Sequence, residues 1–85
     1  MKPVWIVDDD QSIRWVIEKA LTRENIEYKA FSSATDALSA LADDAGDPQV
    51  VVTDIRMPGG SGLDLLQKLK AHSPQLPVII MTAYS

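Results

Sequence analysis

Residues 4–10 read VWIVDDD, four apolar residues followed directly by three aspartates. An unbroken apolar run of this length is typical of a strand that is buried on both faces, as strands are in a parallel sheet. A similar arrangement returns at residues 50–54, VVVTD, and at residues 77–82, PVIIMT. Three predicted strands therefore end in side chains that carry oxygen.

The segments between these strands carry helical patterns. Apolar residues at helical spacing predict three helices, over residues 11 to about 24, 34 to about 43, and 63 to about 72. Asp10 or Ser12 is placed to cap the first helix, and a short strand is predicted at Tyr28–Phe31. The order βαβαβαβ predicts an α/β fold, with a parallel sheet, right-handed crossovers and helices on both faces.

Length and composition limit the possible classes of protein. A chain of 85 residues, 46% of them apolar, can form one small domain with a core. The net charge of -4 argues against nucleic-acid binding by this segment. There are no cysteines, and no apolar run approaches the roughly 18 residues of a membrane span. A cytoplasmic protein without a membrane segment fits these features.

Acidic residues follow the first and third predicted strands. Ligands of open parallel sheets bind outside the carboxyl ends of the strands. If the first and third strands are neighbours, the carboxylates of Asp8, Asp9, Asp10 and Asp54 converge there, with the Thr82 hydroxyl close by. Clustered carboxylates without histidine or cysteine indicate Mg²⁺, and an ionised aspartate beside it can act as a nucleophile toward phosphorus.

Each of these residues also has a simpler explanation. Asp8–Asp10 could be a solvated strand end with a helix cap, Asp54 a turn carboxylate, and Thr82 an ordinary cap. The functional interpretation depends on the whole set, with each member at the end of a strand. Three other residues are predicted to lie on the surface, outside the site: Arg14, Trp15 and His72.

Several segments together resemble the receiver domains of two-component response regulators. They are VWIVDD at residues 4–9, the D-x-R-M-P-G-x-x-G pattern at residues 54–62, and VIIMTA at residues 78–83. The match runs in register over the whole chain. Residues 12–21, SIRWVIEKAL, further resemble the nitrogen regulatory protein C (NtrC) subfamily.

The resemblance implies a role for each matching residue. Asp54 would be the phospho-acceptor, Asp9 a direct Mg²⁺ ligand, and Asp8 its partner acting through water. The backbone carbonyl of Arg56 would complete the metal site, and Thr82 would be the switch hydroxyl that bonds the phosphoryl group. Asp10 falls just past the acidic pair of the family, where it would cap the first helix.

The resemblance also implies an architecture and partners. The fold would be flavodoxin-like (CheY-like), a doubly wound sheet of strand order 2-1-3-4, with residues 1–85 forming a receiver domain incomplete at its C-terminus. A fifth strand, two helices and a phosphoryl-contacting lysine would follow in a longer parent. That parent would be a transcription activator in nitrogen assimilation, with a sensor histidine kinase as partner, a sigma-54-dependent ATPase domain, and DNA contacted only through a C-terminal domain.

Three functions remain open at this point. The first is a phospho-accepting receiver that does not turn over substrate. The second is a Mg²⁺-dependent aspartyl-phosphate phosphohydrolase, which Arg56 disfavours because such enzymes usually carry an aspartate two positions after the nucleophile. The third is a receiver-like module that only binds.

In addition, residues 77–81 would form an apolar sheet edge without a guarding charge, which predicts self-association as a dimer or a higher species.

Overall fold

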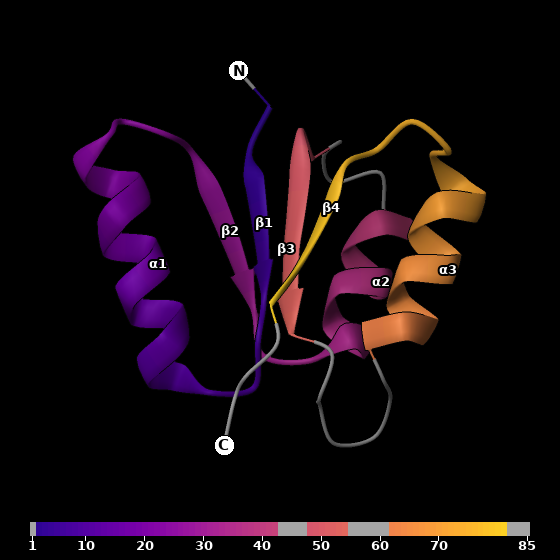
Figure 1. The fold of residues 1–85 in the computed structure, drawn as a ribbon, viewed down its shortest axis with the longest axis horizontal. Helices are drawn as coiled ribbons and strands as arrows, with labels where there is room; N and C mark the ends of the chain where they lie inside the picture. Colours follow the sequence, from indigo (N-terminus) through magenta and orange to yellow (C-terminus); the bar gives the residue numbers. More distant parts are fainter. Residues whose placement is uncertain (1, 43–47, 55–61, 82–85) are drawn as a thin grey trace.

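The computed structural model describes residues 2–42, 48–54 and 62–81. Four strands alternate with three helices, in the predicted order (Figure 1). The strands are β1 (Val4–Val7), β2 (Tyr28–Phe31), β3 (Val50–Asp54) and β4 (Val78–Met81). The helices are α1 (Gln11–Arg23), α2 (Ala34–Ala42) and α3 (Gly62–His72). Among these described residues, no helix is long and apolar enough to cross a membrane.

The four strands form one parallel sheet in the order β2-β1-β3-β4. This is the predicted order, and it makes β1 and β3 neighbours. Helix α1 lies on one face of the sheet, and helices α2 and α3 lie on the other (Figure 1). Because the strands are parallel, their carboxyl ends lie together at one edge, toward the bottom of Figure 1.

The main core lies between the sheet and the pair α2 and α3. Its fully buried members include Trp5 and Val51 from the sheet and Leu65 and Leu69 from α3. The Trp5 ring meets the Phe31 ring at 5.0 Å between centroids, with the planes tilted by 60°, a favourable aromatic arrangement. This core packs against β1 and β3, which pair side by side in the sheet.

Both ends of α1 are capped by short-range bonds. Asp10 accepts hydrogen bonds from the backbone N–H groups of Ser12 and Ile13, so Asp10, and not Ser12, is the cap among the two predicted candidates. At the other end, Asn25 adopts a positive φ of 58°. The Ile26 N–H then donates to the Leu21 carbonyl at 2.9 Å, a closure that asparagine tolerates better than most residues.

The apolar stripe of α1 is less buried than its pattern indicates. No residue of α1 is buried, and Ile13 and Val16 are 43% and 58% exposed. Val78 of β4 packs against the main core, so the next residue, Ile79, points to the α1 face of the sheet, where it is 55% exposed. The reason is that α1 packs against β1 and β2, and no second described helix lies on that face of the sheet (Figure 1). The pattern predicts the helix correctly, but burial depends on what covers it.

Candidate metal centre

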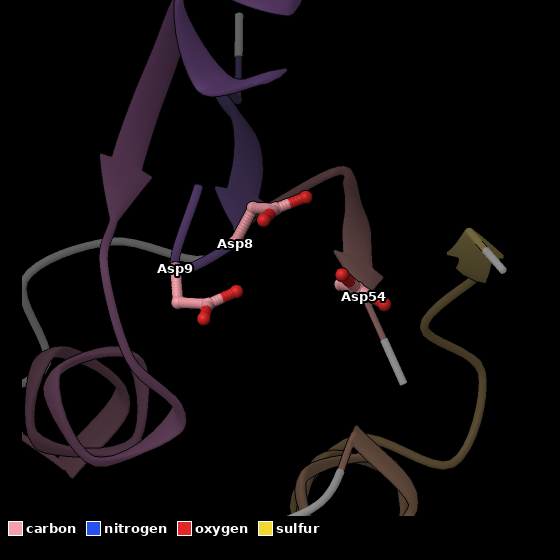
Figure 2. Close-up of side chains that lie close together, drawn as sticks. All are labelled: Asp8, Asp9 and Asp54. Atoms are coloured by element: carbon pink, nitrogen blue, oxygen red, sulfur yellow. The ribbon is translucent and has the colours of Figure 1, made fainter. Parts of the chain in front are cut away.

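Three aspartates meet at the carboxyl ends of β1 and β3. Asp54 is the last residue of β3, and Asp8 and Asp9 directly follow β1. Val7 pairs with Thr53 in the sheet register, so the chain positions just beyond this pair bring Asp8 and Asp54 side by side. One carboxylate oxygen from each of the three residues lies within 4.8 Å of the others (Figure 2). Three of the four carboxylates that were predicted to converge therefore do so, whereas the fourth, Asp10, caps α1.

Backbone contacts hold the two strand ends in place. The Asp8 N–H donates to the Phe31 carbonyl of β2 at 3.1 Å, and the Asp8 carboxylate accepts a bond from the Asp10 N–H at 2.8 Å. On β3, the buried Thr53 hydroxyl donates to the Asp54 carbonyl at 3.1 Å. The backbone that carries the acidic side chains is thus hydrogen-bonded to the sheet and to the start of α1.

The cluster concentrates negative charge in a partly buried position. Asp8 and Asp54 are only 2% and 6% exposed, whereas Asp9 is exposed. Burial raises the pKa of Asp8 above its ordinary value, and the nearby charges of Asp54, Asp9 and Asp10 raise it further. The hydrogen bond from the Asp10 N–H acts in the opposite direction. A cation among these carboxylates would relieve the repulsion.

The donor set fits Mg²⁺. All three side chains offer carboxylate oxygens, which hard divalent cations prefer to nitrogen or sulfur ligands. Two of the carboxylates are buried and one faces solvent. Such a site leaves room for the water molecules that Mg²⁺ usually keeps.

Arg14 contacts this segment, a role that the sequence analysis missed. Its side chain is half-buried, and Nη1 donates to the Asp8 carbonyl at 2.6 Å. The prediction that Arg14 lies on the surface was therefore wrong. Its spacing of four residues from the capping Asp10 was an available signal, because it places Arg14 one helical turn above the acidic segment.

The other predicted residues have different outcomes. Arg56 and Thr82 lie outside the described residues, so their roles stay predictions. Trp15 and His72 are exposed, as predicted. His72 instead lines an open hollow with Lys2, Gln49 and neighbouring residues. That hollow lies where β3 and β4 begin, at the opposite edge of the sheet from the carboxylates.

Comparison with known proteins identifies the family that these features belong to. The family model "Response regulator receiver domain" matches residues 4–85. The DNA-binding transcriptional regulator NtrC of Proteus hauseri is 55% identical over 82 residues, which is 96% of this chain and 17% of that protein. The chain therefore spans about a sixth of that relative's length. The NtrC-type resemblance of the sequence is confirmed.

Solved structures agree with this match. The apo receiver domain of nitrogen regulatory protein C is 50% identical, with a TM-score of 0.85 over 99% of this chain and 66% of that one. Thermotoga maritima TrrA, solved with Mg²⁺ and BeF, is 32% identical, with a TM-score of 0.89 over 100% of this chain and 72% of that one. TrrA has also been solved in complex with the histidine kinase ThkA, again at 32% identity and with the same coverage, at a TM-score of 0.86.

Proposed function

The chain belongs to the response regulator receiver domain family, and from this premise we propose that it accepts a phosphoryl group from a histidine kinase on Asp54. The observation that carries the proposal is the position of Asp54. It is buried at the end of β3, with carboxylate oxygens of Asp8 and Asp9 within 4.8 Å (Figure 2). The carboxyl ends of the strands in a parallel sheet are where α/β proteins bind their ligands.

In the proposed reaction, a carboxylate oxygen of Asp54 attacks the phosphorus of a phosphohistidine. A P–O bond forms and the P–N bond breaks, with its electron pair staying on the histidine nitrogen, which then takes up a proton. The product is an acyl phosphate on the protein itself. The chain is therefore a phospho-acceptor and does not turn over a substrate.

We assign the metal site to the carboxylates of Asp8, Asp9 and Asp54, together with the backbone carbonyl of Arg56. Bound Mg²⁺ would neutralise charge on the transferring phosphoryl group. By the family resemblance, Asp9 would be a direct ligand and Asp8 would act through water. The Thr82 hydroxyl would bond the phosphoryl group after transfer.

The wider role that we propose is control of a transcription activator in nitrogen assimilation. The similarity to NtrC regulators supports this assignment, and with it dependence on sigma-54 and DNA contact through another domain. The complex of TrrA with a histidine kinase supports a kinase as the phosphoryl donor.

The test uses the full-length protein that carries this chain, with acetyl phosphate and Mg²⁺. The parent should gain one phosphoryl group by mass spectrometry, and Asp54→Asn should gain none, because an amide is not a nucleophile toward phosphorus. The matched control is Asp64→Asn, which removes an exposed carboxylate of α3 and should label like the parent. Equal labelling of Asp54→Asn and the parent would show that the assignment is wrong.

Two further measurements, of phosphate release and of Mg²⁺ affinity, separate the two alternative functions. A phosphohydrolase would release inorganic phosphate from a generic phosphate ester over many turnovers. A module that only binds would take up no phosphoryl group and would show no Mg²⁺ affinity dependent on Asp9.

A further inference from the structure

Arg14 holds the acidic segment at two points. Its backbone N–H donates to the Asp10 carbonyl at 3.0 Å, and its Nη1 donates to the Asp8 carbonyl at 2.6 Å. Asp9 lies between these two acceptors in the chain. A single residue of α1 therefore restrains the backbone on both sides of Asp9.

Asp9 depends on such restraint more than its neighbours do. Asp8 and Asp54 are buried, so packing limits where their carboxylates can go. Asp9 is exposed, and packing does little to fix the position of an exposed side chain. The direction in which its carboxylate leaves the backbone is then set mainly by the orientation of the Asp8–Asp9 peptide, whose carbonyl is the group that Arg14 bonds.

We propose that Arg14 is a positioning residue for the divalent cation: it orients the Asp8–Asp9 peptide so that the Asp9 carboxylate faces Asp54. The inference rests on the proposed function, which makes Asp9 a ligand of Mg²⁺. Groups that orient metal ligands without touching the metal typically change metal affinity by roughly 10–100-fold when they are removed.

The sign of the effect distinguishes positioning from charge. A guanidinium close to a cation site repels the cation, so a role through charge alone predicts tighter Mg²⁺ binding once the guanidinium is removed. A positioning role predicts weaker binding, because the carboxylates no longer converge as well. The two explanations therefore predict opposite changes in the dissociation constant.

The test is a Mg²⁺ titration of the whole chain by calorimetry at fixed ionic strength. Arg14→Met should weaken binding by about tenfold or more. Arg14→Lys should recover most of the affinity, because an ammonium can supply the one N–H bond to the Asp8 carbonyl. The matched control is Arg23→Met, which removes a cation from the other end of α1 and should bind Mg²⁺ like the parent.

A second readout needs no metal. In Mg²⁺-free protein, the backbone amide NMR signals of Asp9 and Asp10 should shift in Arg14→Met and return toward the parent positions in Arg14→Lys. A role limited to overall stability would lower the unfolding temperature of both variants without this selective recovery.

Several results would overturn the inference. Equal or tighter Mg²⁺ binding by Arg14→Met would do so, as would a lysine variant as weak as the methionine variant.

If Arg14→Met does not fold by circular dichroism, Arg14→Gln replaces it, since its amide can donate the same bond without charge. Binding by Arg14→Gln at or below the parent affinity supports positioning, and tighter binding refutes it. A parent that binds no Mg²⁺ contradicts the proposed function itself, and the inference with it.

Discussion

At the residue scale, Asp8 carries an electrostatic cost. It is 2% exposed and shares the sheet edge with the charges of Asp54, Asp9 and Asp10. Its pKa is raised above the ordinary value of 3.8, first by burial and then by these neighbours. The folded chain consequently binds the Asp8 proton more tightly than the unfolded chain does, and ionised Asp8 destabilises the fold.

This shift predicts a pH dependence of stability without metal. The contribution of Asp8 to the free energy of unfolding should be most favourable below pH 3.8. It should fall as the pH rises through the raised folded pKa, and the full cost should remain above that pKa. Asp8→Asn should remove this slope and stabilise the metal-free chain at pH 7 by on the order of 1 kcal/mol, because a neutral amide avoids both the cost of burying a charge and the repulsion from neighbouring carboxylates.

Urea unfolding in the presence of a chelator, from pH 4 to pH 7, measures this effect. Glu27→Gln is the control, because it removes an exposed carboxylate outside the cluster. Added Mg²⁺ should stabilise the parent more than Asp8→Asn. An Asp8→Asn variant less stable than the parent at pH 7 without metal would contradict this account of Asp8.

At the scale of elements, α1 links the fold to the site. Its N-terminal cap is Asp10, whose carboxylate accepts bonds at 2.8 and 3.3 Å from the first turn. The same residue donates its N–H to the Asp8 carboxylate. The start of the helix and the acidic cluster therefore share one segment of backbone. Loss of the cap should disturb the structure of both.

Asp10→Ala should lower the free energy of unfolding by about 1 kcal/mol, because two N–H groups of α1 lose their partner. Asp10→Asn should retain most of that stability, since asparagine caps as well as aspartate does. Thermal unfolding followed by circular dichroism provides the comparison. If both variants lose stability equally, the charge of Asp10 matters and its capping bonds do not.

At the scale of the whole molecule, the exposed apolar surface predicts association. Among the described strands, β4 pairs only with β3. It carries Ile79 at 55% exposure, across the sheet face from Ile13 and Val16 on α1. An apolar edge without charge is a template for pairing with another chain. We expect this chain to self-associate through β4 and that face.

Sedimentation equilibrium at micromolar concentration should detect dimers or larger species of the parent chain. Ile79→Lys should shift the distribution strongly toward monomer, because it places a charge on the exposed strand. Gln67→Lys adds a lysine at an exposed position of α3 and should associate like the parent. A parent chain that is monomeric and unfolds cooperatively at these concentrations would refute the expectation.

The sequence alone determined the elements and the identity of the acidic residues. Runs such as VWIV and VVVTD specify strands because their apolar side chains are adjacent in the chain, and Asp10 caps α1 through residues two and three positions away. These are local interactions, and local patterns report them well. The family motifs also single out Asp8, Asp9 and Asp54.

Local sequence patterns do not specify which of these parts meet: the strand order was implied by the family resemblance, and only the tertiary structure shows the contacts. The carboxylates converge because β1 and β3 are neighbours, a pairing between segments more than 40 residues apart that no local pattern encodes. Arg14 reaches the Asp8 carbonyl because α1 turns back beside the end of β1. Ile13 and Val16 in the stripe of α1 remain exposed because burial depends on what lies opposite. Spacing along the chain sets which side chains share a face, but contact depends on how the faces are brought together in space.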